Sequence, residues 1–197
     1  MKAAVTLGAA AVAALAGLAS GCGQRDEPAP PSATARDDAA ARAAFLAVYP
    51  VFMHPRCMNC HPAGDAPLQG DDSHPHIQNV RRGPDGKGLF ALKCANCHQD
   101  TNLAGVHMPP GNSTWRLPAA KTPLVFQGLS PRELADHFKD PGRNGGKSLP
   151  ELVHHVTEDQ LVRWGWNPGD GRAPPPLSHD EFARRFKEWV DKGAASP

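Results

Sequence analysis

Two copies of a five-residue motif constrain this chain more than any other feature of its sequence. Residues 57–61 read CMNCH and residues 94–98 read CANCH, so each follows the pattern C-x-x-C-H. Two thiols separated by two residues can form thioethers with the vinyl groups of one porphyrin, and the histidine that follows is placed to bind the iron. The sequence therefore predicts two covalently attached haem c groups. The predicted attachment residues are Cys57, Cys60, Cys94 and Cys97, and the predicted proximal iron ligands are His61 and His98.

Two other roles are open to a C-x-x-C pair. A zinc knuckle uses four thiolate or imidazole ligands in a tetrahedral array, and a redox dithiol cycles between thiol and disulfide. Here both motifs are completed by histidine, and four of the five cysteines of the chain lie in them. This pattern favours haem attachment over both alternatives, and the fifth cysteine, Cys22, has no cysteine left to pair with.

The composition suits a small domain organised around a cofactor. Of the 197 residues, 40% are hydrophobic but only 6% are aromatic, and there are 21 prolines and 19 glycines. This is little core material for the length, and two haems would add large apolar surfaces against which helices can pack. The formal net charge of +1 does not indicate a nucleic-acid partner. No phosphate-binding loop or nucleophile elbow occurs.

The first 36 residues predict export and a membrane anchor. Residues 1–21 combine Lys2 with an Ala/Leu/Val run and small residues, which is typical of a signal peptide. The run ends LASGC at Cys22, which resembles the lipobox of bacterial lipoproteins, although Ala19 stands where that pattern prefers leucine. Residues 22–36 are polar and rich in proline and alanine, as in a flexible tether. We expect a periplasmic protein held to a membrane by lipid on Cys22; ordinary cleavage nearby is the alternative.

Signals for helices precede the first motif and fill the C-terminal third. Asp37 or Asp38 can cap a helix that runs to Tyr49, and Pro50 is expected to end it. Further along, Ser or Thr precedes Glu or Gln by three residues four times, which predicts four more helices. Their predicted N-caps are Ser130, Ser148, Thr157 and Ser178. The last helix carries apolar residues at helical spacing and is expected to pack on the first.

Between these helices the chain is expected to form long loops. Only a short extended piece around residues 77–82 is predicted between the motifs, and residues 99–129 have no regular pattern. Loops of this length are unusual in a compact domain unless they serve a site. The predicted fold is therefore mainly α, with cytochrome c-like helices and long loops packed around two covalently bound haems over residues 37–197.

Each iron also needs a sixth ligand or an open position, and this choice sets its chemistry. The candidates outside the motifs are His54, His74, His76, His107, His137, His154, His155, His179, Met53, Met58 and Met108. We expect His76, which lies between the motifs, and His155, which flanks the apolar face of its helix, to be the ligands. Met108 and His107 follow closely, since Met108 before two prolines resembles the distal Met-Pro of class I cytochromes c. An ordinary packed or solvated histidine is the alternative at each position.

Several segments resemble a group of small secreted dihaem cytochromes that accompany isoquinoline 1-oxidoreductase-type molybdenum hydroxylases. The similar segments are residues 55–88, 109–111 and 161–169, and residues 86–94 resemble the segment before the haem motif of class I cytochromes c. The resemblance implies that a molybdenum hydroxylase passes electrons to this chain. Any hydroxylation would take place on that partner, because this chain lacks the four-cysteine sets of iron–sulfur subunits.

Taken together, these features predict a dihaem c-type cytochrome that transfers electrons between a partner oxidoreductase and a respiratory acceptor, rather than an enzyme. The alternative is a small haem enzyme, peroxidase-like or ligand-reducing, with one five-coordinate haem. A third hypothesis is a structural module that binds a non-haem metal. The sixth ligand separates the first two, since a carrier holds its iron on both sides while an enzyme leaves one side open.

Overall fold

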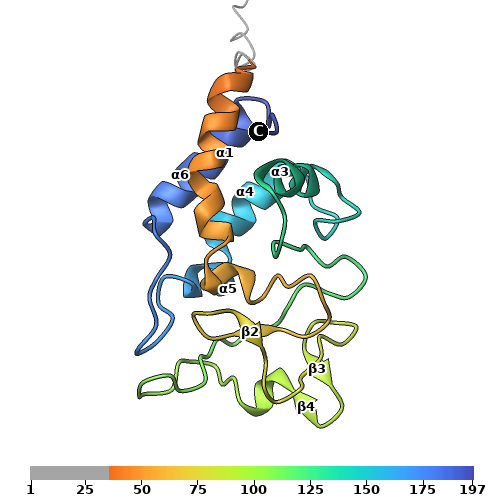
Figure 1. Ribbon diagram of the computed structural model, residues 1–197, viewed down its shortest axis with the longest axis vertical. Helices are drawn as coiled ribbons and strands as arrows, with labels where there is room; N and C mark the ends of the chain where they lie inside the picture. The colour runs from red at the N-terminus through yellow and green to blue at the C-terminus, as the bar shows by residue number, and fades with distance from the viewer. Residues whose placement is uncertain (1–35) are drawn as a thin grey trace, which may run out of the picture. The chain divides into compact units, whose positions relative to one another are not determined.

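The computed structural model describes residues 36–197. The predicted signal peptide, the lipid site at Cys22 and nearly all of the predicted tether lie outside the described residues. In the described part the helices are α1 (Asp38–Phe52), α2 (Pro55–Met58), α3 (Pro131–Lys139), α4 (Leu149–Glu158), α5 (Gln160–Trp164) and α6 (His179–Asp191) (Figure 1). Helix makes up 36% of the described residues and sheet very little, which agrees with the predicted helical class.

The sheet within the described residues consists of two short antiparallel ladders. The strands β1 (Leu68–Gln69) and β2 (His74–Pro75) pair with each other, as do β3 (Gly88–Leu89) and β4 (Leu92–Lys93). A short 3₁₀ helix, η1 (Cys94–Asn96), follows β4 directly and carries the start of the second motif. The extended piece predicted around residues 77–82 is wrong, because no strand forms there. Residues 99–129 contain no helix or strand, as predicted.

The core is formed where α1 and α6 lie side by side, with α4 packed against α6 (Figure 1). Its centre is aromatic: the Phe45 and Trp189 rings lie with their centroids 4.9 Å apart. Six of the seven phenylalanines are buried in this cluster, namely Phe45, Phe52, Phe126, Phe138, Phe182 and Phe186. The few aromatic residues of the chain are thus concentrated in one helical core, and the prediction that the last helix packs on the first is confirmed.

Most of the predicted helix starts are confirmed. Asp37 caps α1 by accepting a hydrogen bond from the Ala40 N–H at 3.0 Å. Ser130 and Ser148 cap α3 and α4, and in each case the glutamate three residues on accepts a hydrogen bond from the N–H of the capping serine. Ser178 caps α6. Such caps satisfy N–H groups that have no partner within the helix.

Two predictions about helix ends are wrong. Pro50 lies inside α1, which continues to Phe52. The proline cannot donate the hydrogen bond of its turn, but Val51 and Phe52 beyond it are buried in the core, and their burial offsets that loss. Thr157 lies within α4, where its hydroxyl donates to the Val153 carbonyl at 2.8 Å. The N-cap of α5 is Asp159.

Both motifs lie in the part of the chain that is rich in loops. Buried polar contacts hold these loops together, as is required where backbone groups have no ladder to join. The Arg82 side chain, only 3% exposed, donates to the carbonyls of Gly64 and Pro118, both at 2.9 Å. The described residues include no helix with the length and apolar character needed to cross a membrane.

Replacing one core aromatic residue tests the packing of α1 on α6. Phe45→Ala should lower the free energy of unfolding by about 3–5 kcal/mol, because it removes a fully buried ring that contacts Trp189. Its neighbour Leu46, which is 49% exposed, gives a matched control. Leu46→Ala should cost no more than about 0.5 kcal/mol in denaturant unfolding. Equal losses in the two variants would contradict this packing.

Candidate functional site

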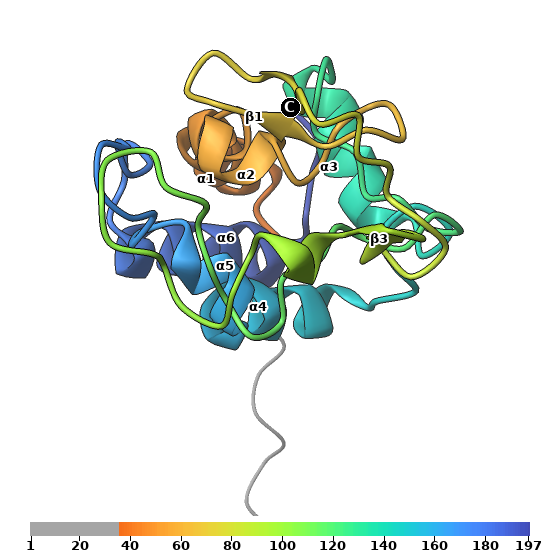
Figure 2. The same cartoon turned by 90° about the horizontal axis from the view of Figure 1, so that it is seen from below.

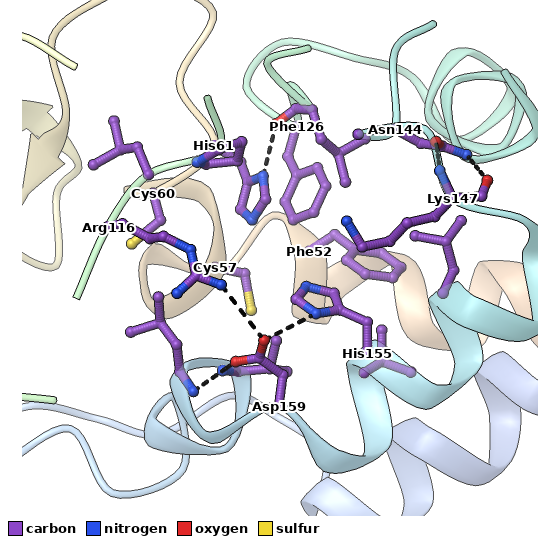
Figure 3. Close-up of a pocket in the computed structure, with 18 of the residues that line it drawn as sticks. Phe52, Cys57, Cys60, His61, Arg116, Phe126, Asn144, Lys147, His155 and Asp159 are labelled. Atoms are coloured by element: carbon purple, nitrogen blue, oxygen red, sulfur yellow. Dashed lines mark hydrogen bonds and ion pairs between the residues drawn. The ribbon is translucent and has the colours of Figure 1, made fainter. Parts of the chain in front are cut away.

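The first motif lines a cavity of about 310 Å³, which we call the first pocket (Figure 3). Cys57 comes from α2, and Cys60 and His61 follow it. The far wall is made by His155 and Val156 of α4 together with residues of α5. Figure 2 shows α2 on one side of the molecule and α4 and α5 on the other. Chain segments about a hundred residues apart therefore build this pocket together.

The His61 ring is held in a fixed orientation within the first pocket. Its Nδ1 lies 2.6 Å from the Leu124 carbonyl oxygen, and its ring stacks on Phe126 with centroids 3.9 Å apart. A carbonyl accepts only, so Nδ1 carries the proton and Nε2 keeps a free lone pair, which is the form in which histidine binds a metal. Burial lowers the pKa of His61 to about 3, so the ring is neutral at physiological pH.

The second motif lines a cavity of about 720 Å³, the second pocket, and repeats the same arrangement. The Nδ1 of His98 lies 2.7 Å from the Pro110 carbonyl oxygen, and its ring stacks on Trp115 with centroids 4.3 Å apart. Burial also lowers the pKa of His98. In both pockets, then, the motif histidine donates to a backbone carbonyl, stacks on an aromatic ring and keeps Nε2 free.

His155 lies in the first pocket, where its ring and the His61 ring are turned toward the same cavity (Figure 3). Its Nδ1 is 3.2 Å from Oδ2 of Asp159, one turn further along the chain. The other ring nitrogen, Nε2, is thus the one left for a metal. The neighbouring His154 lines neither pocket.

His76 lies in the second pocket, with its ring centroid 6.4 Å from that of His98. Histidine nitrogens bind transition metals at about 2.0–2.1 Å, and each nitrogen lies roughly 1.1–1.2 Å from its ring centre, given ring bonds of about 1.35 Å. Two imidazoles on opposite sides of one metal ion therefore have ring centres about 6.2–6.6 Å apart. The Nδ1 of His76 is buried and has no hydrogen-bond partner among the described residues. The spacing and the unpartnered nitrogen both suit a shared metal ion.

The other candidate ligands are placed less favourably. His107 lines the second pocket, which makes it a third imidazole there. Met108 lines neither pocket and its side chain is 41% exposed. The same holds for the remaining candidates, none of which lines a pocket: His54, His74, His137, His154, His179, Met53 and Met58. Several have other partners; His74, for example, pairs with Asp72 at 2.6 Å.

The two pockets share a wall. Four residues line both of them: Arg56, Cys60, Leu117 and Trp164. Arg56 is buried and forms an ion pair with Asp71, and its Nε has no partner among the described residues. The Trp164 ring lies edge-on to Trp115, with centroids 4.8 Å apart, while Trp166 packs on Phe182 in the core. Trp164 thus lies at the site and Trp166 at the core.

The alternatives of a zinc knuckle and a redox dithiol find no support in the described residues. No three or more His, Cys, Asp or Glu side chains among residues 36–197 are gathered so that they could hold a metal ion. Burial raises the pKa of Cys57 to about 12 and that of Cys60 to about 11. Disulfide exchange uses the thiolate, and burial disfavours that form at Cys57 and Cys60.

The residues present fit a haem in each pocket. Both cavity volumes fall within the ~300–1,000 Å³ that is usual for ligand and cofactor sites. Apolar rings line both cavities, and each also has cations that can pair with the two propionates of a haem. They include Arg116 and Lys147 in the first pocket and Lys93 and Arg172 in the second. The sequence did not identify Phe126 or Trp115 as site residues, because each meets its motif histidine only through long-range folding. It did not identify Asp159 either, although its spacing of four residues from His155 is a local signal.

Comparisons of the chain with known protein families, with curated proteins and with solved structures find no match. Function is therefore inferred from the residues and the geometry of the two pockets. The two pockets share one arrangement, which is the strongest guide to function. In each, a backbone carbonyl fixes the motif histidine, and a second histidine lines the same cavity.

Proposed function

We propose that this protein is a dihaem c-type cytochrome that transfers electrons between a partner oxidoreductase and a respiratory acceptor. A haem c bound in each pocket would supply a one-electron Fe(III)/Fe(II) couple. The observation that carries the proposal is the pairing of two imidazoles at a C-x-x-C-H motif, clearest in the 6.4 Å between the rings of His76 and His98. A second imidazole enters the other pocket as His155.

In this proposal the chain's own residues hold and tune the cofactors. The thiols of Cys57 and Cys60, and of Cys94 and Cys97, would attach one haem each. His61 and His98 would be the proximal ligands, oriented by the carbonyls that their Nδ1 atoms face. His155 in the first pocket and His76 in the second would be the sixth ligands.

Two histidines per iron favour a carrier over the alternative haem enzyme. If His61 and His155 held one iron and His98 and His76 the other, small molecules would have no free coordination site. The shared wall of Arg56, Cys60, Leu117 and Trp164 keeps the pockets adjacent, so an electron received at one is close to the other. An enzyme would need one of these sixth ligands to be absent or displaced.

The proposals for the electron donor and the cellular location are supported by the sequence. The resemblance to cytochromes that accompany molybdenum hydroxylases supports an enzyme of that class as the donor. The leader supports export to the periplasm, and Cys22 supports a lipid anchor to a membrane. The redox partners would then meet this protein at the membrane surface.

Haem content tests the proposal directly. When the chain is produced in a host that matures cytochromes c, a pyridine-haemochrome assay should give two haems per chain. The double variant Cys94→Ala/Cys97→Ala should give half that ratio, because one attachment site is lost and the other is intact. A wild-type ratio near one, or haem that leaves the chain in denaturant, would contradict the proposal.

The sixth ligands can be assigned by opening one iron at a time. His155→Ala and His76→Ala should each add a high-spin absorption component and carbon monoxide binding at one of the two haems. His154→Ala and Met108→Ala are matched controls, since neither side chain lines a pocket, and both should keep the wild-type spectrum. If the wild-type protein already binds carbon monoxide at one iron, the enzyme alternative is the better explanation.

The anchor is tested by fractionation. Cys22→Ser should move the protein from the membrane fraction to the soluble periplasm, because the residue that would carry the lipid is replaced. Its haem content should not change, since both motifs are intact. Wild-type protein that is found wholly in the soluble fraction would argue against the anchor.

A further inference from the structure

The proposed sixth ligands of the two pockets differ in what holds them. The Nδ1 of His155 lies 3.2 Å from Oδ2 of Asp159. Among the described residues His76 forms no ion pair with a carboxylate, unlike His155. On the proximal side the pockets match, because His61 and His98 both face backbone carbonyls, at 2.6 and 2.7 Å. The difference between the two ligand sets is therefore one carboxylate.

Asp159 is fixed in place by contacts other than the one with His155. It is the N-cap of α5 and accepts hydrogen bonds from the N–H groups of Leu161 and Val162 at 2.8 and 3.4 Å. Nη2 of Arg116 lies 3.9 Å from its Oδ2. An aspartate side chain is ionised at neutral pH, so the group beside Nδ1 of His155 is a carboxylate.

A carboxylate beside the non-coordinating nitrogen of a metal-bound imidazole makes that imidazole a stronger electron donor. Stronger donation favours the ferric state and lowers the reduction potential of the iron. Other charges line the pockets in similar numbers. The first has Arg56, Asp85, Arg116 and Lys147, and the second has Arg56, Asp71, Lys93 and Arg172. Asp159 differs from these residues because its carboxylate contacts a proposed ligand, His155, directly.

We propose that Asp159 is a positioning residue that acts through His155 and makes the first pocket the lower-potential site of the pair. Within one chain, electrons then pass from the first pocket to the second. This inference rests on the proposed function, since it takes His155 as an iron ligand. It goes beyond that function by ordering the two sites and naming the side chain that orders them.

Asp159→Asn tests the charge of this residue without removing its role as the N-cap of α5. Asparagine caps helices about as well as aspartate, so α5 should be retained, but its amide carries no charge. A spectroelectrochemical titration of the wild type should show two one-electron waves. In Asp159→Asn the midpoint potential of the lower wave should rise by about 59 mV. For a one-electron couple, this shift raises the ratio of reduced to oxidised haem about tenfold at a fixed potential. The upper wave should stay in place.

Two further variants serve as controls. Asp72→Asn breaks another His–Asp pair, with His74 at 2.6 Å; neither residue lines the first pocket, so the lower wave should stay in place. Asp159→Ser also keeps a good capping residue and should move the lower wave in the same direction as Asp159→Asn. Circular dichroism and the haem-to-protein ratio should match the wild type in all three variants.

The outcomes separate this inference from the proposed function. Two wild-type waves of which neither moves, or of which the upper one moves, would overturn the role of Asp159 and leave the dihaem carrier standing. Loss of haem in both Asp159 variants would make the residue structural and would likewise overturn its tuning role. A wild-type protein without covalent haem would overturn the proposed function, and this inference with it.

Discussion

The hydrogen bond from each motif histidine to a backbone carbonyl is the contact on which the rest of the structure depends. His61 faces the Leu124 carbonyl and His98 faces that of Pro110. Each bond ties a C-x-x-C-H motif to a loop further along the chain. The same loops bring Phe126 and Trp115 onto the histidine rings. The long irregular stretch between residues 99 and 129 thus has a structural purpose, because it positions both histidines.

This plan divides the work between the helices and the loops. The α1–α6 pair, with α4, encloses six of the seven phenylalanines and forms a core that needs few other apolar residues. From this core α4 presents His155 to the first pocket, while a loop presents His76 to the second. Asp159 follows directly on this helix, one turn beyond His155, and among the described residues His76 has no such ion pair. His155, on a helix, therefore has a carboxylate beside it, while in the described part of the chain His76, on a loop, does not.

Local signals predicted much of this structure, and long-range packing explains what they missed. The serine caps of α3, α4 and α6 were predicted because a cap depends on residues three apart. The continuation of α1 past Pro50 was not predicted, because it depends on the burial of Val51 and Phe52 in the core. His76 and His155 were singled out from the sequence and each lines a pocket, although their role as iron ligands stays a prediction. The aromatic partners of the motif histidines come from distant loops, and no local pattern marks them.

Intact-protein mass spectrometry in denaturant tests the central claim most directly, because only covalent groups remain on the chain. Protein matured in a host that attaches haem c should carry a mass excess of two haem groups, in a single dominant species. This result would mean that both pockets are haem sites. A mass equal to that of the processed polypeptide alone, or with a single haem, would contradict the claim that the two pockets form a pair of haem c sites.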